Sequence, residues 1–347
     1  MVETDPHVSA AALTTFGTRF LTAMGCAPTV AVEVAEHLVE ADLAGVYSHG
    51  IFRLSQYADN ARTGIFAPEG EAVLSEAEGG GPLVNGGNGF GIPALRLATD
   101  TAIDDARAGA AAVGVMNVGH TGRIGAYAEH GANAGCLTII LGGGSREQSR
   151  QVAPYGGARA VLPTNPYAFG IPGGEHGPVV FDFATAAGAG GKAYAARSSG
   201  RPLPEGLCID ASGAPTTDPE DYFNGGALLP MAGPKGYGMA IVAELLGEAI
   251  YGQAMDGMNW ICVCIDLGRF KEASAYSRAA EVCLAELRTC PPAPGFDRVE
   301  VPGERERRLR TERLKNGIPI PPATLAELKG SAIKLGIDSS GLEKLLN

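Results

Sequence analysis

The sequence predicts a mixed α/β fold in which helices from both ends of the chain pack against a central sheet. Apolar residues recur at helical spacing near the start, at Leu13, Phe16 and Phe20. Short segments rich in β-branched residues and bounded by glycine, proline or asparagine fill the middle of the chain. A charge-rich helical pattern returns after residue 302. We therefore expect one helical unit and one mixed α/β unit, at residues 1–75 with 291–347 and at residues 76–290.

The expected elements follow in order along the chain. Helical spacing predicts a first helix at 13–24 and, after Pro28, a second helix at 28–42. The glycine-rich stretch 79–91 predicts a tight loop that brings the backbone close to another group, with a helix behind it at 94–108. Buried strands are expected at 111–118, 137–141, 167–171, 179–183 and 260–266. Further helices are expected at 239–251, 302–315 and 321–335.

The composition predicts a soluble, globular protein of the cytoplasm. Hydrophobic residues make up 45% and charged residues 19% of the 347 residues. The chain contains no apolar run of about 18 residues, the length that spans a bilayer. The acidic start, from Met1 to Asp5, lacks the basic and apolar regions of a signal peptide. We therefore expect a cytoplasmic protein with no membrane partner.

The seven cysteines give no sign of a metal site or a disulfide framework. They are odd in number and lie mostly among apolar residues, so we expect reduced, buried side chains. Cys262 and Cys264 are separated by one residue, whereas structural zinc sites usually have roughly two to four, and no histidine lies nearby. We therefore expect no bound metal.

The net charge of −11 argues against nucleic acid as a partner, because phosphates require a basic surface. It also constrains how a small anion would bind. A few arginines or lysines would have to be concentrated at the site against an unfavourable global field.

Two familiar phosphate-binding patterns fail when they are tested on this chain. The stretch 188–192 ends in Gly-Lys, but Ala186 stands where a P-loop needs its first glycine and Ala193 where it needs a serine or threonine. Gly87 and Gly89 begin a G-x-G-x-x-G pattern, but position 92 is isoleucine. The sequence therefore does not support a Rossmann fold.

The segment Ser48-His49-Gly50-Ile51-Phe52-Arg53 is the first candidate site. In a helix or tight turn, His49 and Arg53 lie four residues apart on one face, with Tyr57 one turn further. The guanidinium of arginine matches a carboxylate in two parallel hydrogen bonds. The alternative is a capping histidine at the surface beside a solvated arginine.

His120 is the second candidate, because it follows a predicted buried strand in a glycine-rich loop. An imidazole with an ordinary pKa near ~6.5 exchanges a proton with a hydroxyl or carbonyl oxygen at neutral pH. A purely structural histidine is the alternative.

Two charged residues are further candidates. Asp182, at the end of an apolar run, is costly to bury alone, so we expect it to orient a histidine or to bind cofactor hydroxyls. Lys235 stands at an expected helix N-terminus, where a phosphate or carboxylate contact competes with a solvated side chain.

Taken together, these motifs resemble the malate/L-lactate dehydrogenase family. The likeness runs nearly from end to end. It includes S-H-G-I-F-R-L-x-x-Y at 48–57, G-H-T-G-R-I-G-A-Y-A-E at 119–129, A-P-Y-G-G at 153–157, P-T-N-P at 163–166, D-F-A-T at 182–185, G-K at 191–192, L-L-P at 228–230, K-G-Y-G at 235–238 and V-P-G-E at 301–304. Each piece is weak by itself, but their shared order is specific.

The resemblance implies an L-sulfolactate dehydrogenase-like fold. This is a mixed-sheet NAD(P)-binding fold that differs from the Rossmann fold. The resemblance also implies a homodimer. It implies NAD as the cofactor, with NADP as the alternative, and a small anionic 2-hydroxy or 2-oxo acid as the substrate. His120 matches the proton-transfer histidine of the family, and Ser48, His49 and Arg53 match its substrate cluster. The implied cofactor-binding residues are Ser145, Thr164, Asn165, Asp182, Phe183, Ala184, Lys235, Gly303 and Glu304.

Some residues depart from the common family pattern. Thr121 follows the histidine where many members have phenylalanine, and Arg123 lies close by, as in the hydroxycarboxylate dehydrogenase branch. Arg123 is a candidate second cation for the substrate. Pro163 replaces a glycine, and Ala186 replaces a serine. These two changes bear on cofactor affinity and remove no proton-transfer group.

The resemblance implies a reduction in which Arg53 holds the substrate carboxylate and protonated His120 donates to the developing alkoxide. Asp182, His49 and Ser48 would position that imidazole or tune its pKa. One alternative keeps the fold but reduces a cyclic ketimine such as piperideine-2-carboxylate. Two further alternatives are a non-catalytic carboxylate-binding protein and a thiol or metal enzyme that uses Cys262 and Cys264.

Overall fold

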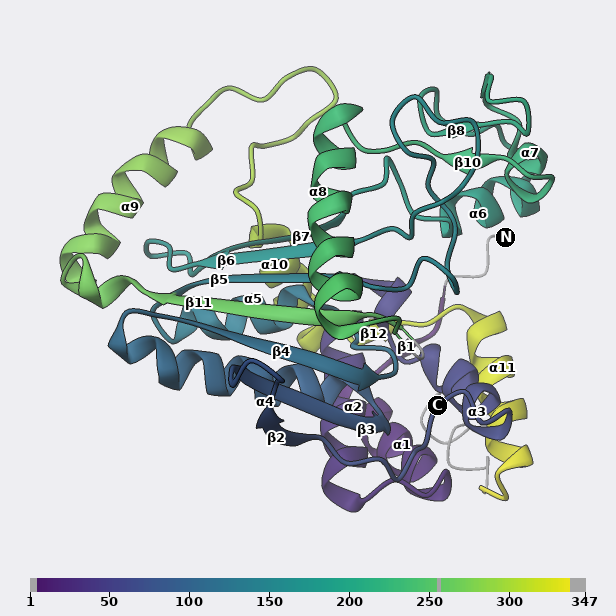
Figure 1. Ribbon diagram of the computed structural model, residues 1–347, viewed down its shortest axis with the longest axis horizontal. Helices are drawn as coiled ribbons and strands as arrows, with labels where there is room; N and C mark the ends of the chain where they lie inside the picture. Colours follow the sequence, from purple (N-terminus) through teal and green to yellow (C-terminus); the bar gives the residue numbers. More distant parts are fainter. Residues whose placement is uncertain (1–4, 255–256, 338–347) are drawn as a thin grey trace.

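A seven-stranded mixed sheet forms the centre of the molecule (Figure 1). The computed structural model describes residues 5–254 and 257–337. Only β3 and β4 run parallel, and every other neighbouring pair in this sheet is antiparallel. In spatial order the strands are β2 (Val73–Glu76), β3 (Pro82–Gly89), β4 (Ala110–Val118), β11 (Asn259–Asp266), β5 (Cys136–Gly143), β6 (Pro166–Ile171) and β7 (Val179–Ala184).

Helices cover both faces of the sheet. Helices α4 (Gly91–Asp105) and α5 (Gly125–Asn133) pack on one face, where Ile140 of β5 belongs to the shared apolar core. Helix α8 (Pro234–Glu244), which continues into a π-helical turn at Leu245–Ala249, packs on the other face against Leu141. The side chains of the neighbouring residues Ile140 and Leu141 thus pack into the cores on opposite faces of the sheet, because side chains alternate between the two faces along a strand.

The two chain ends form a helical layer of their own. Strands β1 (His7–Val8) and β12 (Ile318–Pro319) pair antiparallel and join the N-terminal helices to the C-terminal one in a single apolar core. This core supports the division into residues 1–75 with 291–347 and residues 76–290, which remains our proposal. The helices of this layer are α1 (Ala10–Ala23), α2 (Pro28–Leu43), α3 (Arg53–Arg62), α10 (Glu304–Asn316) and α11 (Pro322–Lys334).

A third, smaller lobe inside the central region was not predicted. It has its own apolar core, which includes Leu203, Leu207 and Leu228. Its strands are only two residues long, so they carry no alternating pattern that would reveal them. The small lobe consists of α6 (Gly191–Ser199), β8 (Cys208–Ile209), β9 (Pro215–Thr216), α7 (Pro219–Phe223) and β10 (Ala227–Leu228). Helix α9 (Ala273–Arg288), also not predicted, lies outside it.

The prediction of a tight loop at 79–91 is wrong for most of its length, because β3 occupies Pro82–Gly89. The glycines are nevertheless needed for a close approach of backbones. A Cβ on Gly86 would lie 2.3 Å from Cγ1 of Val118 on the neighbouring strand. A Cβ on Gly89 would lie 2.3 Å from the carbonyl oxygen of Gly70.

None of the helices within residues 5–254 and 257–337 has the length and apolar character needed to cross a bilayer. The predicted cysteine environment is confirmed at five of the seven positions, which are buried, and all seven thiols are free. Cys283 and Cys290 are exposed instead; Cys283 lies on α9, which buries none of its residues fully, and Cys290 lies just beyond the end of that helix.

Candidate functional site

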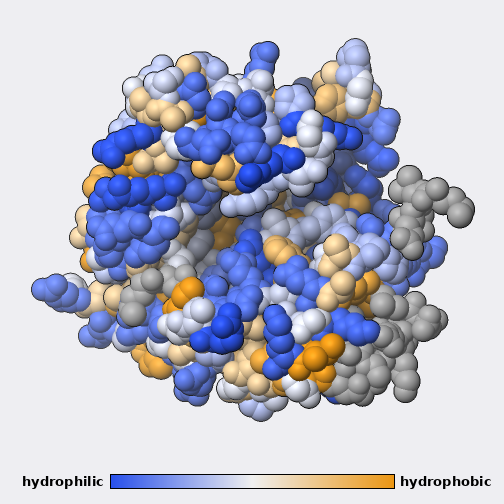
Figure 2. All heavy atoms as spheres, turned by 90° about the vertical axis from the view of Figure 1, so that its right-hand side faces the viewer, coloured by the Kyte–Doolittle hydropathy of each residue, from blue (hydrophilic) through white to orange (hydrophobic). Residues whose placement is uncertain are grey.

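A cavity of about 560 Å³ lies where the sheet, the helical layer and the small lobe meet. Figure 2 shows the face of the molecule that is hollowed between the small lobe and the helical layer. We call this space the first cavity. Its lining includes His49 from the helical layer, His120 from the loop after β4, Phe183 from β7, Trp260 from β11 and Gln151 from the small-lobe side.

His120 is held in this cavity by Tyr57, a residue of α3. The Tyr57 hydroxyl lies 2.7 Å from Nδ1 of His120. The backbone N–H of Gly122 donates to the same nitrogen at 3.3 Å, so Nδ1 acts as an acceptor in the neutral ring. The proton of the neutral imidazole therefore resides on Nε2.

His49 lies against His120 rather than on a helix with Arg53. It ends a short 3₁₀ turn (Tyr47–His49), and α3 begins only at Arg53. The two imidazoles are stacked, with 5.4 Å between their centroids and 18° between their planes. The Ser48 hydroxyl lies 2.8 Å from Nδ1 of His49. Ser48, His49 and His120 therefore lie in one cluster, and of the helix and the tight turn expected for the 48–53 segment, the structure shows the turn.

Both histidines are neutral at pH 7 in this arrangement. Burial lowers the pKa of His120 well below its ordinary value, and the guanidinium of Arg53 lowers it further. Burial, followed by Arg53, lowers the pKa of His49 to about 4. A protonated imidazole would need both a proton donor and relief from this positive charge.

The loop that carries His120, residues 119–125, is fixed from three sides. Nε2 of His37, on α2, accepts the backbone N–H of Arg123 at 2.9 Å. The Tyr127 hydroxyl donates to the carbonyl of Thr121 at 2.7 Å. Oδ2 of Asp182 accepts the N–H of Gly125 at 2.8 Å. These anchors position the imidazole without occupying its Nε2 face.

Arg53 is close to the histidines but is not among the described residues that line the first cavity. Its Nε donates to the carbonyl of Ser48 at 2.8 Å, and Nη1 donates to Oε1 of Gln56 at 2.5 Å. These bonds use two of the five N–H groups of a guanidinium and leave the others for a ligand.

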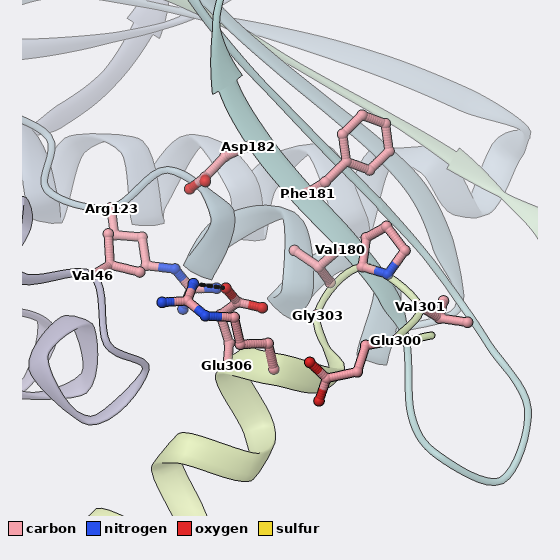
Figure 3. Close-up of a pocket in the computed structure, with 11 residues that line it drawn as sticks. Val46, Arg123, Val180, Phe181, Asp182, Glu300, Val301, Gly303 and Glu306 are labelled. Carbon is pink, nitrogen blue, oxygen red and sulfur yellow. Dashed lines mark hydrogen bonds and ion pairs between the residues drawn. The ribbon is translucent and has the colours of Figure 1, made fainter. Parts of the chain in front are cut away.

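Asp182 stands between the first cavity and a second one of about 320 Å³, and it lines both. Figure 3 shows the second cavity between β7 and the turn that leads into α10.

Arg123 lines this second cavity and not the first, so the structure does not place it as a second cation beside His120. No hydrogen bond among the described residues joins Asp182 to a histidine.

The residues expected to bind the cofactor do not all line the cavities. Ser145, Thr164, Phe183 and Ala184 line the first cavity, and Gly303 lines the second. Asn165 lies behind the first cavity, fully buried, and its Nδ2 donates to Oε1 of Glu244 at 2.6 Å.

Lys235 and Glu304 line neither cavity. Lys235 is exposed at the start of α8. The Glu304 carboxylate instead closes the 301–304 turn, because it accepts Nε of Arg288 at 2.6 Å and the N–H of Val301 at 3.0 Å.

Two buried polar atoms in the first cavity lack a hydrogen-bond partner among the described residues, Oγ of Ser145 and Nε1 of Trp260. Buried polar atoms are almost always paired, so each invites a ligand or a water molecule. The carboxamide of a nicotinamide offers an acceptor oxygen and two N–H donors, which match an indole N–H and a hydroxyl oxygen. The lining of the cavity therefore fits a nicotinamide cofactor.

A family model described as malate/L-lactate dehydrogenase matches residues 8–329. The chain belongs to this family. An L-lactate dehydrogenase from Cupriavidus necator is 35% identical over 323 residues, which cover 89% of this chain and 92% of that protein. A Δ1-pyrroline-2-carboxylate/Δ1-piperideine-2-carboxylate reductase from Pseudomonas putida is 31% identical over 320 residues, which cover 88% and 91%.

The solved structure of sulfolactate dehydrogenase from Methanocaldococcus jannaschii superposes with a TM-score of 0.86 at 28% identity and covers 96% of this chain and 98% of that one. Membership in the malate/L-lactate dehydrogenase family confirms the predicted fold and enzyme class. The protein is an NAD(P)-dependent oxidoreductase that interconverts a 2-hydroxy acid and its 2-oxo acid.

Three residues contact or line this site in ways that the sequence did not predict. Tyr57 was expected beside Arg53, but its bond to His120 spans 63 positions of sequence. His37 holds the His120 loop from 86 positions away. Trp260 is recognisable only as the single tryptophan of a buried strand. None of these contacts leaves a local pattern, because each one joins elements that meet only in the folded chain.

Asp42 lies beneath the His49 turn and links it to the rest of the helical layer. Its side chain is 3% exposed and accepts the N–H of Ile51 at 2.7 Å. A Cβ on Gly50 would lie 1.8 Å from Oδ1 of Asp42, so only glycine allows this close approach. Burial raises the pKa of Asp42 to about 7, and the hydrogen bond from Ile51 opposes that rise.

We expect Asp42→Asn to remove a pH dependence of stability. Because the pKa of the folded state lies above the value of 3.8 for an unperturbed aspartate, the folded protein binds the extra proton, and its stability falls as the pH rises from about 4 to about 7. Asparagine keeps an acceptor for Ile51 but does not titrate. Each pKa unit corresponds to about 1.4 kcal/mol, so the variant should gain about 4 kcal/mol relative to wild type between pH 4 and pH 8.

Urea unfolding of both proteins at several pH values measures this difference. Asp59→Asn, at a side chain of α3 that is 64% exposed, is the matched control and should show a constant difference from wild type. A constant difference for Asp42→Asn as well would contradict the assignment.

Proposed function

We propose that the protein reduces a small 2-oxo acid to the 2-hydroxy acid in the first cavity, with His120 as the proton donor. The balanced reaction is 2-oxo acid + NADH + H⁺ → 2-hydroxy acid + NAD⁺, and it is reversible. The observation that carries this proposal is the Tyr57–His120 pair, which fixes the imidazole with Nε2 free in a cavity that fits a nicotinamide. A bound reduced nicotinamide supplies the hydride to C2.

The proton transfer follows from the electrostatics of the cluster. Arg53 lowers the pKa of His120 in the free protein. A substrate carboxylate on Arg53 neutralises that charge, so anion binding raises the pKa of His120 and favours the imidazolium. The Tyr57 oxygen then accepts the new Nδ1–H, and Nε2–H donates to the oxygen on C2 as it becomes an alkoxide. In the oxidation the ring carries its proton on Nδ1, bonded to the Tyr57 oxygen, and Nε2 takes the proton back from the substrate hydroxyl.

Ser48 and Asp182 have positioning roles in this proposal. The Ser48 hydroxyl fixes the ring of His49, which stacks on His120. Asp182 fixes the His120 loop through Gly125. Because Asp182 also borders both cavities, it is placed to accept a hydroxyl of a cofactor that extends from the first cavity into the second. We propose NAD as the cofactor, with NADP as the alternative.

We also propose a homodimer that acts in the cytoplasm. One face of α8 and the turn that continues it exposes Ile241, Val242 and Leu245, which are 38%, 50% and 58% exposed. These positions share a helical face, and a contiguous apolar patch of this kind supports a protein interface. The free thiols support the proposal of a cytoplasmic location, because cysteines stay reduced in that compartment.

The test of the proposed function uses purified protein with NADH or NADPH and a panel of 2-oxo acids, with the loss of cofactor absorbance as the signal. We expect turnover of at least one of pyruvate, oxaloacetate, phenylpyruvate and 2-oxoglutarate. Trp260 is the single tryptophan and lines the first cavity, so quenching of its fluorescence reports cofactor binding separately from turnover.

Each other outcome points to a different function. Turnover of piperideine-2-carboxylate alone would assign the protein to ketimine reduction, the alternative that the Pseudomonas putida relative represents. Fluorescence quenching without any turnover would favour a non-catalytic binding protein. Loss of turnover with a thiol reagent or a chelator would favour chemistry at Cys262 and Cys264, whose thiols are buried against Thr99 and Thr138.

A further inference from the structure

The first cavity carries polar groups of one particular kind. Among the described residues that line it, none is an arginine or a lysine, and Asp182 is the one carboxylate. The other polar side chains are histidines, the indole of Trp260, hydroxyls and amides. The wall on the side of the small lobe, which we call the amide wall, consists of Gln148, Ser149, Gln151, Ala189 and Gly190.

The amide wall is preformed around Gln151. Nε2 of Gln151 donates to Oγ of Ser149 at 2.7 Å, and the Tyr222 hydroxyl donates to Oε1 of Gln151 at 3.3 Å. A Cβ on Gly190 would lie 2.8 Å from Oη of Tyr222 and 2.9 Å from Oε1 of Gln151. A larger residue at position 190 would therefore displace this amide, and glycine keeps it at the cavity.

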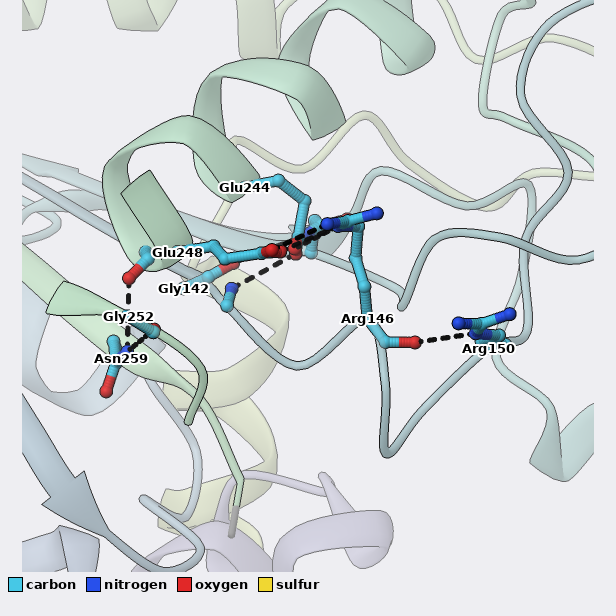
Figure 4. Close-up of polar contacts among 10 residues, drawn as sticks. Gly142, Arg146, Arg150, Glu244, Glu248, Gly252 and Asn259 are labelled. Carbon is cyan, nitrogen blue, oxygen red and sulfur yellow. Dashed lines mark hydrogen bonds and ion pairs between the residues drawn. The ribbon is translucent and has the colours of Figure 1, made fainter. Parts of the chain in front are cut away.

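None of the cations nearest in sequence to the amide wall lines the first cavity. Nε and Nη2 of Arg146 bind the Glu248 carboxylate at 2.7 and 2.6 Å, and Nε of Arg150 donates to the Arg146 carbonyl at 3.1 Å. Figure 4 shows the Arg146 guanidinium directed at Glu244 and Glu248. Lys192 is exposed and packs beside Gly188, outside the cavity lining.

We propose that the substrate carries a single carboxylate and an uncharged tail that forms hydrogen bonds, such as an amide, a urea or a hydroxyl group. This inference rests on the proposed function and specifies its substrate class. Among the described residues, Arg53 is an arginine that lowers the pKa of both His49 and His120, and the C1 carboxylate binds it. A second anionic group at the amide wall would lose its water without gaining a cation. An apolar tail would leave the second N–H of Gln151 and the second lone pair of its Oε1 without partners.

Three 2-oxo acids with the same heavy-atom skeleton test the tail directly. They are oxaloacetate, its C4 monoamide 2-oxosuccinamate, and 4-methyl-2-oxopentanoate, with pyruvate as the tail-free reference. We expect kcat/KM for the monoamide to exceed the values for oxaloacetate and for 4-methyl-2-oxopentanoate by about tenfold or more, because about 1.4 kcal/mol of differential binding gives that ratio.

Preference for oxaloacetate, preference for 4-methyl-2-oxopentanoate, or equal rates for all three would overturn the inference and leave the proposed function intact. If no 2-oxo acid is turned over, including pyruvate, the proposed function is wrong and this inference is wrong with it. The order within the panel and the presence of turnover are thus separate readouts.

A variant pair locates the effect at the amide wall. Gln151→Lys places a cation there, and we expect the ratio of kcat/KM for oxaloacetate to that for the monoamide to rise about tenfold or more. Ser198→Lys adds the same charge at an exposed position of α6 and should leave the ratio unchanged, which controls for the net charge of the protein. Trp260 quenching by NADH verifies that both variants fold and bind. An unchanged ratio in Gln151→Lys with normal quenching would overturn the inference.

Discussion

Replacing His120 by asparagine should lower kcat by about 10²- to 10⁴-fold in both directions, the range that general acid–base catalysis contributes. Asparagine retains a polar group beside Tyr57 but cannot carry a proton to or from the substrate oxygen. Quenching of Trp260 by NADH should remain at the level of wild type, because the indole and Ser145 are untouched. A loss of turnover with retained binding would separate chemistry from folding.

The pH profile strengthens this test. Because the protonated ring is the donor, kcat/KM for reduction in the wild type should rise as the pH falls towards the lowered pKa of His120. The rate of oxidation should fall over the same interval, because it requires the neutral ring. His120→Asn should lack both trends. His176→Asn, at an exposed position, is the matched control. Activity of His120→Asn within about threefold of wild type would rule out the proposed role.

Much of the sheet was predictable because its strands carry their own signal. The segment 111–118 was expected as a strand, and β4 covers Ala110–Val118. The segment 260–266 corresponds to β11 at Asn259–Asp266 in the same way. Apolar, β-branched residues between turn residues identify such strands without reference to the rest of the fold.

Order and partners within the sheet were not predictable in this way. Strand β11 inserts between β4 and β5, although more than a hundred residues separate it from β5 in the sequence. The glycines of 79–91 suggested a loop, but Gly86 and Gly89 belong to β3, where neighbouring atoms come too close for a Cβ. A glycine-rich segment has the same composition in both situations, so composition alone does not separate them.

The site shows the same division between local and distant information. Ser48, His49 and His120 were expected to lie together, and the structure stacks the two imidazoles 5.4 Å apart. Of the helix and the tight turn expected for 48–53, the structure shows the turn, because Gly50 approaches Asp42 closely and the segment divides into a 3₁₀ turn and a separate helix. Asp182 was expected to orient a histidine or to bind cofactor hydroxyls. Its contact with the His120 loop is a hydrogen bond from the backbone N–H of Gly125, and a sequence pattern does not reveal backbone donors.

Replacing Arg53 by glutamine should lower kcat/KM by about 10²- to 10³-fold, mainly through a higher KM. Loss of one partner of a hydrogen-bonded charge pair costs about 2–5 kcal/mol, and the carboxylate is bound in the ground state as well as in the transition state. Arg53→Lys should recover only part of the loss, because an ammonium lacks the planar fork. Arg62→Gln, at a side chain of the same helix that is 73% exposed, should behave like wild type.

The pH profile of Arg53→Gln distinguishes a binding cation from a structural residue. Arg53 lowers the pKa of both His120 and His49, so its removal should raise both pKa values. The pH dependence of kcat/KM should then shift to higher pH in Arg53→Gln and stay near its wild-type position in Arg53→Lys, which keeps the charge. A residue that only supports α3 would alter the level of activity in both variants and leave the pH profile in place. A raised KM together with a shifted pH profile would therefore show that the Arg53 guanidinium both binds the substrate carboxylate and sets the pKa of His120, the proton donor.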